Sequence, residues 1–248
     1  MNSPETILRF KDIHKSFGSK IVHQGVSFDL YKGEMLGLFG GSGTGKSVLI
    51  RSIIGLEEPD SGEIIFEGKN VVHLTESNYI HVRKKIGFVF QNGALFDSMS
   101  VEENLAYPLR EHTNLSESEI HQKVEDMLEI VDMKGSNNLL PNELSGGMQK
   151  RAGLARATIM EPSIILYDEP TAGLDPVNTQ RLVKNVKRLK SKGITGIFVT
   201  HDIPAAMEIC DRIAILNKGK IHIIDTVENI RKSQDPFVQS FVQGVYAR

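Results

Sequence analysis

The spacing of hydrophobic residues changes several times along the chain. Up to about residue 90, short β-branched and aromatic runs stand between turn residues, which is the pattern of β-strands. A Gly-rich loop and one helix, at 46–55, interrupt these runs, and no second helix is expected there. The expected strands are 21–30, 34–39, 63–67 and 86–90.

Between about 98 and 162 the spacing becomes helical. Ser100 with Glu103, and Ser116 with Glu119, each place a hydroxyl at a helix start and a carboxylate three residues later, so both pairs predict capping boxes. After Ser116, apolar residues at helical spacing predict a helix with one buried face. They are Ile120, Val124, Met127, Leu128 and Val131.

From residue 164 onward, strands alternate with helices, which predicts a parallel sheet with crossover helices. Helices are expected to open at Asp175 and Asp202, and Asn217-Lys218-Gly219 predicts a hairpin turn. The expected strands are 164–167, 194–200, 213–216 and 220–224.

The last segment, 228–248, predicts a short amphipathic helix with Phe237, Phe241 and Val245 on one face. Such a helix packs either on its own domain or on a neighbouring chain, and the spacing alone does not choose between the two.

Composition excludes several classes of protein. The 248 residues carry 29 Lys and Arg against 31 Asp and Glu, a net charge of −2, without the basic excess of proteins that bind nucleic-acid backbones. The one cysteine forms neither an internal disulfide nor a cysteine-rich zinc cluster. No apolar run approaches the roughly 20 residues that cross a bilayer, so we expect any membrane role to come through a partner.

Residues 40–47 match the pattern G-x-x-x-x-G-K-[ST] and lie between an apolar strand and a helix, as a phosphate-binding loop does. In such a loop, backbone N–H groups face phosphate oxygens, Lys46 reaches the β- and γ-phosphates, and Ser47 binds Mg²⁺. An unused Gly-rich turn is the alternative, and the strand–loop–helix context disfavours it. The predicted nucleotide-binding residues are Gly40, Gly41, Ser42, Gly43, Thr44, Gly45, Lys46 and Ser47.

Asp168 and Glu169 follow the expected strand at 164–167. The carboxyl ends of parallel strands form the ligand-binding edge of an open α/β sheet. Asp168 is therefore a candidate for the magnesium shell, and Glu169 for the group that orients or deprotonates an attacking water. A carboxylate pair that only caps the next helix is the alternative, and the phosphate loop favours the first interpretation.

A second helix start lies about a hundred residues after the phosphate loop. The segment 144–149, Leu-Ser-Gly-Gly-Met-Gln, offers an N-cap hydroxyl, two glycines and exposed N–H groups, which suit a second anion. It matches Leu-Ser-Gly-Gly-x-Gln, the signature of ABC proteins, and the chain resembles the ATP-binding subunits of that family over nearly its whole length. The resemblance implies that Ser145, Gly146, Gly147 and Gln149 contact the nucleotide of a second subunit.

Four further positions match the family in order. The resemblance implies that Phe17 stacks on adenine, that Gln91 is the Q-loop residue, and that His201 is the switch histidine. It also implies that Asp175 belongs to the D-loop and, like Phe17, to the nucleotide-binding residues. Taken alone, they read as a core aromatic, a surface amide, a helix cap and part of a solvated loop. The predicted catalytic residues are Glu169, His201 and Gln91, and the predicted magnesium ligands are Ser47, Gln91 and Asp168.

The resemblance implies an α/β fold with a P-loop NTPase (RecA-like) core, an N-terminal antiparallel β subdomain and an inserted α-helical subdomain. Residues 1–248 are expected to form one ABC ATPase domain. Residues 1–91 and 163–227 would form the core with the β subdomain, 92–162 the helical signature subdomain, and 228–248 a C-terminal helical extension. Two such chains are expected to form a head-to-tail homodimer around ATP and Mg²⁺.

Segments 91–113 and 235–244 are similar to those of Mla/Mkl-type lipid-transport ATPases. The first follows the Q-loop, where the family's transmembrane partner docks its coupling helix. The similarity implies a peripheral subunit at the cytoplasmic face of the bacterial inner membrane that powers phospholipid transport between inner and outer membranes. A permease, an MCE-domain lipid-binding protein and a STAS-domain auxiliary subunit are the implied partners, and nucleic acid is not among them.

Other functions stay open at this point. The ATPase of another importer or exporter, and a soluble ABC ATPase such as one in iron–sulfur cluster assembly, share every catalytic motif. A P-loop kinase or GTPase is disfavoured, because Asn217-Lys218-Gly219 is followed by Lys220 where guanine recognition needs aspartate, and because a kinase has no use for the 144–151 segment.

Overall fold

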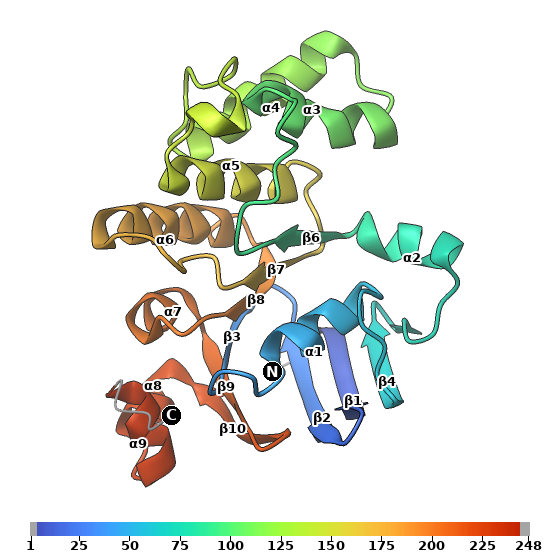
Figure 1. Cartoon of the computed structure of the whole chain (residues 1–248), viewed down its shortest axis with the longest axis vertical. Helices are drawn as coiled ribbons and strands as arrows, with labels where there is room; N and C mark the ends of the chain where they lie inside the picture. The colour runs from blue at the N-terminus through green and yellow to red at the C-terminus, as the bar shows by residue number, and fades with distance from the viewer. Residues whose placement is uncertain (1–3, 244–248) are drawn as a thin grey trace.

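The computed structural model describes residues 4–243 and contains a six-stranded sheet in the order β10-β9-β3-β8-β7-β6. Five of its strands run parallel, and β10 pairs antiparallel with β9. In Figure 1 the order runs from β6 in the upper half to β10 near the bottom. The strands are β3 (Met35–Phe39), β6 (Ile86–Val89), β7 (Ile164–Asp168), β8 (Thr195–Val199), β9 (Arg212–Asn217) and β10 (Lys220–Thr226).

A second, four-stranded antiparallel sheet has the order β2-β1-β4-β5. Strand β1, the first of the chain, was not expected from the sequence. The reason is a β-bulge: the adjacent Ile7 and Leu8 are both buried, and the pairing register shifts near Asp12, which has a φ of 52°, so the period-2 pattern is interrupted. The strands are β1 (Thr6–Phe17), β2 (Lys20–Tyr31), β4 (Ser61–Phe66) and β5 (Lys69–Asn70).

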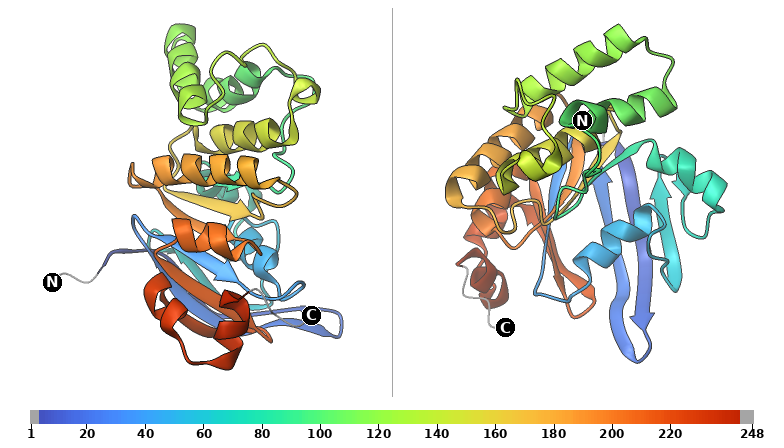
Figure 2. Two further views of the ribbon diagram at one scale, coloured as in Figure 1. Left: turned by 90° about the vertical axis from the view of Figure 1, so that its left-hand side faces the viewer. Right: turned by 45° about the horizontal axis from the view of Figure 1, so that its top comes forward.

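Helices cover both faces of the parallel sheet. Helix α1 lies between the two sheets, α5, α6 and α7 lie on the opposite face, and α3 and α4 lie beyond α5 (Figure 1, Figure 2). The helices are α1 (Lys46–Ile53), α2 (Glu76–Arg83), α3 (Val101–His112), α4 (Glu117–Ile130), the 3₁₀ turn η1 (Pro141–Glu143), α5 (Gly146–Thr158), α6 (Pro176–Lys190), α7 (Ile203–Ile209), α8 (Val227–Lys232) and α9 (Pro236–Val242).

Alternate side chains of each central strand enter different cores, as the pleat requires. In β7, Ile165 and Tyr167 join the core beneath α5, α6 and α7, whereas Ile164 and Leu166 join the core that contains α1. Both faces of the strand are therefore buried, which explains its continuous apolar run in the sequence.

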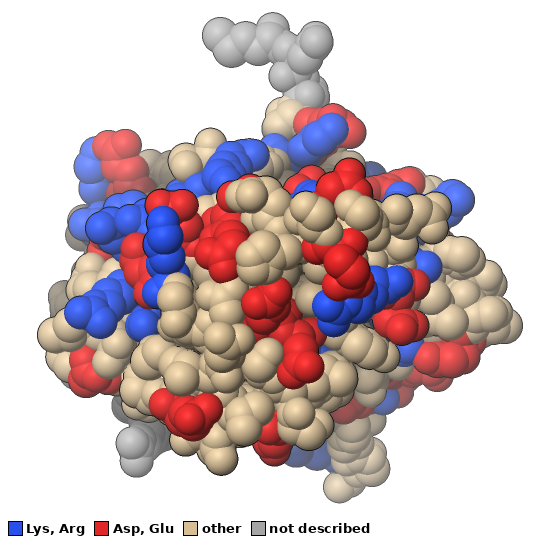
Figure 3. Space-filling view, turned by 90° about the horizontal axis from the view of Figure 1, so that it is seen from above, with Lys and Arg blue, Asp and Glu red and all other residues tan. Residues whose placement is uncertain are grey.

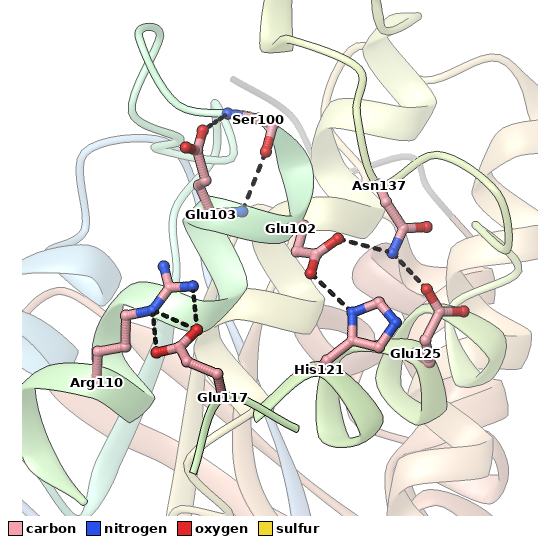
Figure 4. Close-up of polar contacts among 8 residues, drawn as sticks. All are labelled: Ser100, Glu102, Glu103, Arg110, Glu117, His121, Glu125 and Asn137. Atoms are coloured by element: carbon pink, nitrogen blue, oxygen red, sulfur yellow. Dashed lines mark hydrogen bonds and ion pairs between the residues drawn. The ribbon is translucent and has the colours of Figure 1, made fainter. Parts of the chain in front are cut away.

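Both predicted capping boxes are confirmed (Figure 4). The backbone N–H of Glu103 donates to the Ser100 hydroxyl at 3.2 Å, and that of Glu119 donates to the Ser116 hydroxyl at 3.4 Å. All five apolar residues expected on the inner face of α4 are buried.

Polar contacts tie α3 and α4 to each other and to the following loop (Figure 4). Glu102 contacts His121 Nδ1 at 2.8 Å and accepts from the Asn137 side chain at 3.2 Å, and Asn137 also donates to Glu125. Hydrogen bonding to Glu102 raises the pKa of His121 above its ordinary value. Seen from above, acidic side chains spread over this end of the molecule with basic ones between them (Figure 3).

The expectation of one helix before residue 90 is wrong, because α2 also forms there. Only Tyr79 of α2 is buried, so the helix lacks the apolar stripe by which such segments are found in a sequence.

At the C-terminal end of the chain, α9 packs Val238 and Phe241 on the chain's own core, and Val245 lies outside the described residues. No helix among residues 4–243 is long and apolar enough to cross a membrane.

Helix α5 touches the β6 region backbone to backbone. A Cβ atom on Gly153 would lie 2.6 Å from the carbonyl oxygen of Gly93, and one on Gly87 would collide with the carbonyl of Ala157. Glycine at these positions allows the helix to lie directly on β6 and on the loop that follows it.

We expect Gly153→Ala to lower the free energy of unfolding by about 1–3 kcal/mol, since the added methyl group would push α5 away from the backbone of Gly93. Gly146→Ala is the matched control on the same helix, because a Cβ there meets open space and alanine favours helix. Urea unfolding followed by circular dichroism measures both. Equal stability of the two variants would contradict the close contact.

Candidate functional site

Four neighbouring strands bring the predicted chemistry to one edge. In the order β3-β8-β7-β6, the segments after the carboxyl ends are the phosphate loop, His201, Glu169 and Gln91. Residues separated by more than 150 positions in the sequence therefore become neighbours because their strands are adjacent.

A pocket of about 630 Å³ lies at this edge. Its walls come from β1 and β2, the phosphate loop, and the segments after β6, β7 and β8. It is lined by Phe17, Lys20, Val22, Ser42, Gly43, Gly45, Lys46, Ser47, Val48, Gln91, Glu169, Thr171, Ala172, Leu174, Thr179, Thr200, His201 and Asp202.

The Lys46 ammonium is buried at the base of the phosphate loop. It donates to the carbonyl oxygens of Gly40 at 2.9 Å and Gly41 at 3.1 Å, and its Nζ lies 3.4 Å from His201 Nε2. Burial lowers the pKa of Lys46, and the charges of Glu169 and Asp168 oppose that shift. The buried cation is therefore in place to bind a polyphosphate, whose oxygens would take over from the loop carbonyls.

Asp168 is almost fully buried and points to α1. One carboxylate oxygen accepts from the Ser47 hydroxyl at 2.6 Å, and the other from the Arg51 guanidinium at 2.9 Å. Residues 4–243 hold no group of three or more His, Cys, Asp or Glu side chains that could bind a metal. A few oxygen donors beside a phosphate site suit Mg²⁺, which commonly takes one or two protein ligands and completes its shell with phosphates and water.

Glu169 turns the other way, into the pocket. It has a left-handed φ of 51°, and its carboxylate accepts from the backbone N–H of His201 at 3.1 Å and lies 3.2 Å from His201 Nε2. A partly exposed carboxylate next to a phosphate site can orient or deprotonate a water molecule.

Phe17 is 46% exposed at the rim of the pocket, so it is not the core aromatic that its position in a strand first suggests. The Lys15 ammonium lies 4.9 Å from the centre of the Phe17 ring and is held by the carbonyl of Glu58 at 2.6 Å. The ring is therefore supported on its protein side and offers a surface on which a base can stack.

The signature residues Ser145, Gly146, Gly147 and Gln149 do not line this pocket. Ser145 caps α5 by accepting from the Met148 N–H at 3.3 Å, and the Gln149 amide donates to the carbonyl of Pro141 at 2.8 Å. The N-terminus of α5 faces solvent, since Ser145 and Gly146 are exposed.

Asp175 also lies outside the pocket lining and caps α6. Its carboxylate accepts from the backbone and side-chain nitrogens of Asn178 at 2.9 and 2.6 Å, and these bonds lower its pKa. Asn178 in turn packs against Gly147, where any Cβ would collide with its side-chain oxygen. Asn178 thus links Asp175 of the D-loop to the signature of the same chain.

Three side chains near the site were missed from the sequence. Arg51 follows Ser47 by four residues and so shares its helix face, and Lys15 precedes Phe17 by two residues on the same strand face, so spacing could have indicated both. Thr200, which contacts Thr171 at 3.3 Å between their hydroxyl oxygens, has no comparable signal.

Comparisons with known proteins agree with this geometry. A family model described as ABC transporter matches residues 23–172. The chain is 39% identical to the intermembrane phospholipid transport system ATP-binding protein MlaF of Escherichia coli K12. The match extends over 244 residues, which are 98% of this chain and 91% of that protein. It is 40% identical over 238 residues to the probable ribonucleotide transport ATP-binding protein mkl of Mycobacterium leprae, spanning 96% of this chain and 69% of that protein.

Solved structures are similar as well. An ATP-binding cassette solved as a dimer in a post-hydrolysis state with ADP and Pi matches with a TM-score of 0.80 and 30% identity, over 89% of this chain and 98% of that one. The protein cbiO1 of Clostridium perfringens, part of the complex cbiONQ, matches with a TM-score of 0.85 and 27% identity, over 95% and 94%. These likenesses confirm the expected fold class, an α/β P-loop NTPase core with an antiparallel β subdomain.

Proposed function

This chain belongs to the ABC transporter family as an ATP-binding subunit that hydrolyses ATP, and we propose that it powers phospholipid transport through a partner permease between the inner and outer membranes of a bacterium. The observation that carries this proposal is the 39% identity, over 98% of the chain, to a protein named for intermembrane phospholipid transport. The chain would act at the cytoplasmic face of the inner membrane, with an MCE-domain protein and a STAS-domain subunit as further partners.

In the proposed reaction, Lys46 and the N–H groups of the phosphate loop bind the β- and γ-phosphates, and Phe17 stacks on the base. Ser47, Asp168 and Gln91 would hold Mg²⁺, which supplies positive charge against the phosphate oxygens. Glu169 orients or deprotonates the attacking water, and His201 lies beside it.

We propose that two copies pair head to tail, so that the signature of one chain closes the nucleotide pocket of the other. The support is geometric: the N-terminus of α5 exposes Ser145 and Gly146 to solvent and faces no phosphate of its own chain's pocket. A helix N-terminus favours negative charge, and in this arrangement ATP supplies it.

A second cavity, of about 480 Å³, suits the permease. It lies between α2, β6, α3 and the second half of α5, and its walls include Ile80, Phe88, Phe90 and Pro108. Near it, Phe96 and Tyr107 are both 41% exposed, and Arg156 covers the Phe96 ring at 4.2 Å. Exposed aromatic side chains around a groove favour a bound helix from a partner.

To test the proposal, the chain would be tagged and its membrane complex extracted in mild detergent, with proteins and lipids identified by mass spectrometry. We expect a permease, an MCE-domain protein and bound phospholipid. The double variant Phe96→Ala, Tyr107→Ala should lose the permease while ATP binding persists, because the two rings lie outside the nucleotide pocket. Val177→Ala on α6 is the control, since that side chain is also well exposed but away from the groove.

The purified complex would then be placed in vesicles, and ATP-dependent transfer of phospholipid would be measured. If the vesicles instead transferred a ribonucleotide, the substrate class in the name of the mycobacterial relative, the proposed substrate would be wrong but the chain would still be a transport ATPase. Recovery of soluble partners alone would overturn the transport function.

A further inference from the structure

Arg51 occupies a position next to the nucleotide site that none of the recognised motifs covers. Its guanidinium donates to one oxygen of Asp168 at 2.9 Å, while the Ser47 hydroxyl donates to the other at 2.6 Å. Both oxygens of the carboxylate are therefore held from one helix, α1, and their directions are set together.

Helix geometry explains this arrangement. Ser47 and Arg51 are four residues apart, so they lie on the same face of α1, one turn from each other. The short serine reaches the nearer oxygen of Asp168, and the long arginine reaches the farther one. Arg51 keeps 41% of its side chain exposed, whereas Asp168 keeps 5%.

A carboxylate so deeply buried needs a cation or several hydrogen bonds to remain charged. Among residues 4–243, Arg51 is the ion-pair partner of Asp168, because the Lys46 ammonium bonds instead to Gly40 and Gly41. Arg51, which does not line the pocket, thus supplies the countercharge at one oxygen, and the other oxygen bonds to Ser47, which does line it.

We propose that Arg51 is a positioning residue for the magnesium site: by holding one oxygen of Asp168, it fixes the orientation of the other toward Ser47. This inference rests on the proposed function, because it takes Ser47 and Asp168 as metal ligands. Partners that orient metal ligands in this way commonly change metal affinity without contacting the metal.

A purely structural role for Arg51 makes a different prediction. If Arg51 only offset the buried charge of Asp168, its loss would lower stability and reduce hydrolysis equally at every Mg²⁺ concentration. A positioning role instead shifts the Mg²⁺ concentration that gives half-maximal hydrolysis, and excess Mg²⁺ restores much of the rate.

The test uses the full chain and the variants Arg51→Met and Arg51→Lys. We expect Arg51→Met to raise the half-saturating Mg²⁺ concentration by about 10- to 100-fold at saturating ATP. Binding of a fluorescent ATP analogue in EDTA should be unchanged, since no metal takes part. Arg51→Lys keeps the charge but donates from a single nitrogen, so its half-saturating Mg²⁺ concentration should lie between those of the wild type and Arg51→Met.

Arg9→Met is the matched control, because Arg9 is also a half-exposed arginine in a short ion pair, at 2.6 Å from Asp29 on β1 and β2, away from the pocket. It should leave the Mg²⁺ dependence of hydrolysis unchanged.

A second experiment measures metal affinity without turnover. Binding of Mn²⁺ in the presence of ATP is followed by electron paramagnetic resonance in chains that carry Glu169→Gln, with and without Arg51→Met.

An unchanged half-saturating Mg²⁺ concentration in Arg51→Met would overturn the inference and leave the proposed function intact. If Arg51→Met does not fold, Arg51→Lys decides by the same criterion. A wild-type chain whose nucleotide binding and hydrolysis ignore Mg²⁺ would instead refute the metal site on which the proposed function depends.

Discussion

Glu169→Gln is expected to lower the steady-state rate of ATP hydrolysis by about 100- to 10,000-fold while ATP binding persists. Glutamine keeps the shape of the side chain and still accepts a hydrogen bond from the His201 N–H, now 3.1 Å from Glu169 Oε2, but it does not take a proton from water. The binding side chains Lys46 and Phe17 are untouched by the change.

Phosphate release and the binding of a fluorescent ATP analogue would be measured side by side, and gel filtration with ATP should show the variant as a trapped dimer. Glu161→Gln is the control, because Glu161 precedes the other end of β7, is exposed and pairs with Lys123. If Glu169→Gln hydrolysed ATP at the wild-type rate, Glu169 would not be the general base.

Lys46→Met is expected to weaken ATP binding without lowering the stability of the fold. Loss of a buried, charged hydrogen-bond donor to phosphate should weaken ATP binding by about 10- to 100-fold or more. The fold itself should be equally or more stable, because burial lowers the pKa of Lys46 and the charged ammonium therefore disfavours the folded state.

The sign of the pH effect follows from the same shift. With its pKa lowered on folding, Lys46 binds a proton more tightly in the unfolded chain, so its contribution to stability rises with pH as the folded group titrates. Thermal unfolding with and without ATP and Mg²⁺ would test both parts: ATP should raise the melting temperature of the wild type more than that of Lys46→Met. Lys218→Met, at the exposed β9–β10 hairpin, is the control. A less stable variant that still binds ATP would contradict the expectation.

The sequence predicted those elements whose patterns are regular. Strand β7 and the helix caps at Ser100, Ser116 and Asp175 were found because continuous apolar runs and capping residues are local signals. Strand β1 was missed because its bulge breaks the alternation, and α2 because it buries only Tyr79. Their stability comes from neighbouring strands and from the rest of the fold, which no local pattern records.

The candidate site divides along similar lines. Sequence motifs named Lys46, Glu169 and His201, and the order of the parallel strands brings them to one pocket. The roles of Lys46 and Glu169 are predictions that the variants above test. Spacing places Arg51 on the helix face of Ser47 and Lys15 on the strand face of Phe17, but their contacts with Asp168 and with the Phe17 ring are visible only in the folded chain.

The contact of α5 with the loop after β6 has a mechanical consequence. Gly153 meets Gly93 backbone to backbone, so no side chain between them can change rotamer and absorb a displacement. Gly93 lies two residues after Gln91, and α5 begins with the signature glycines. We therefore expect a displacement of the loop at Gln91 to move α5 directly, and with it the signature residues at the start of that helix.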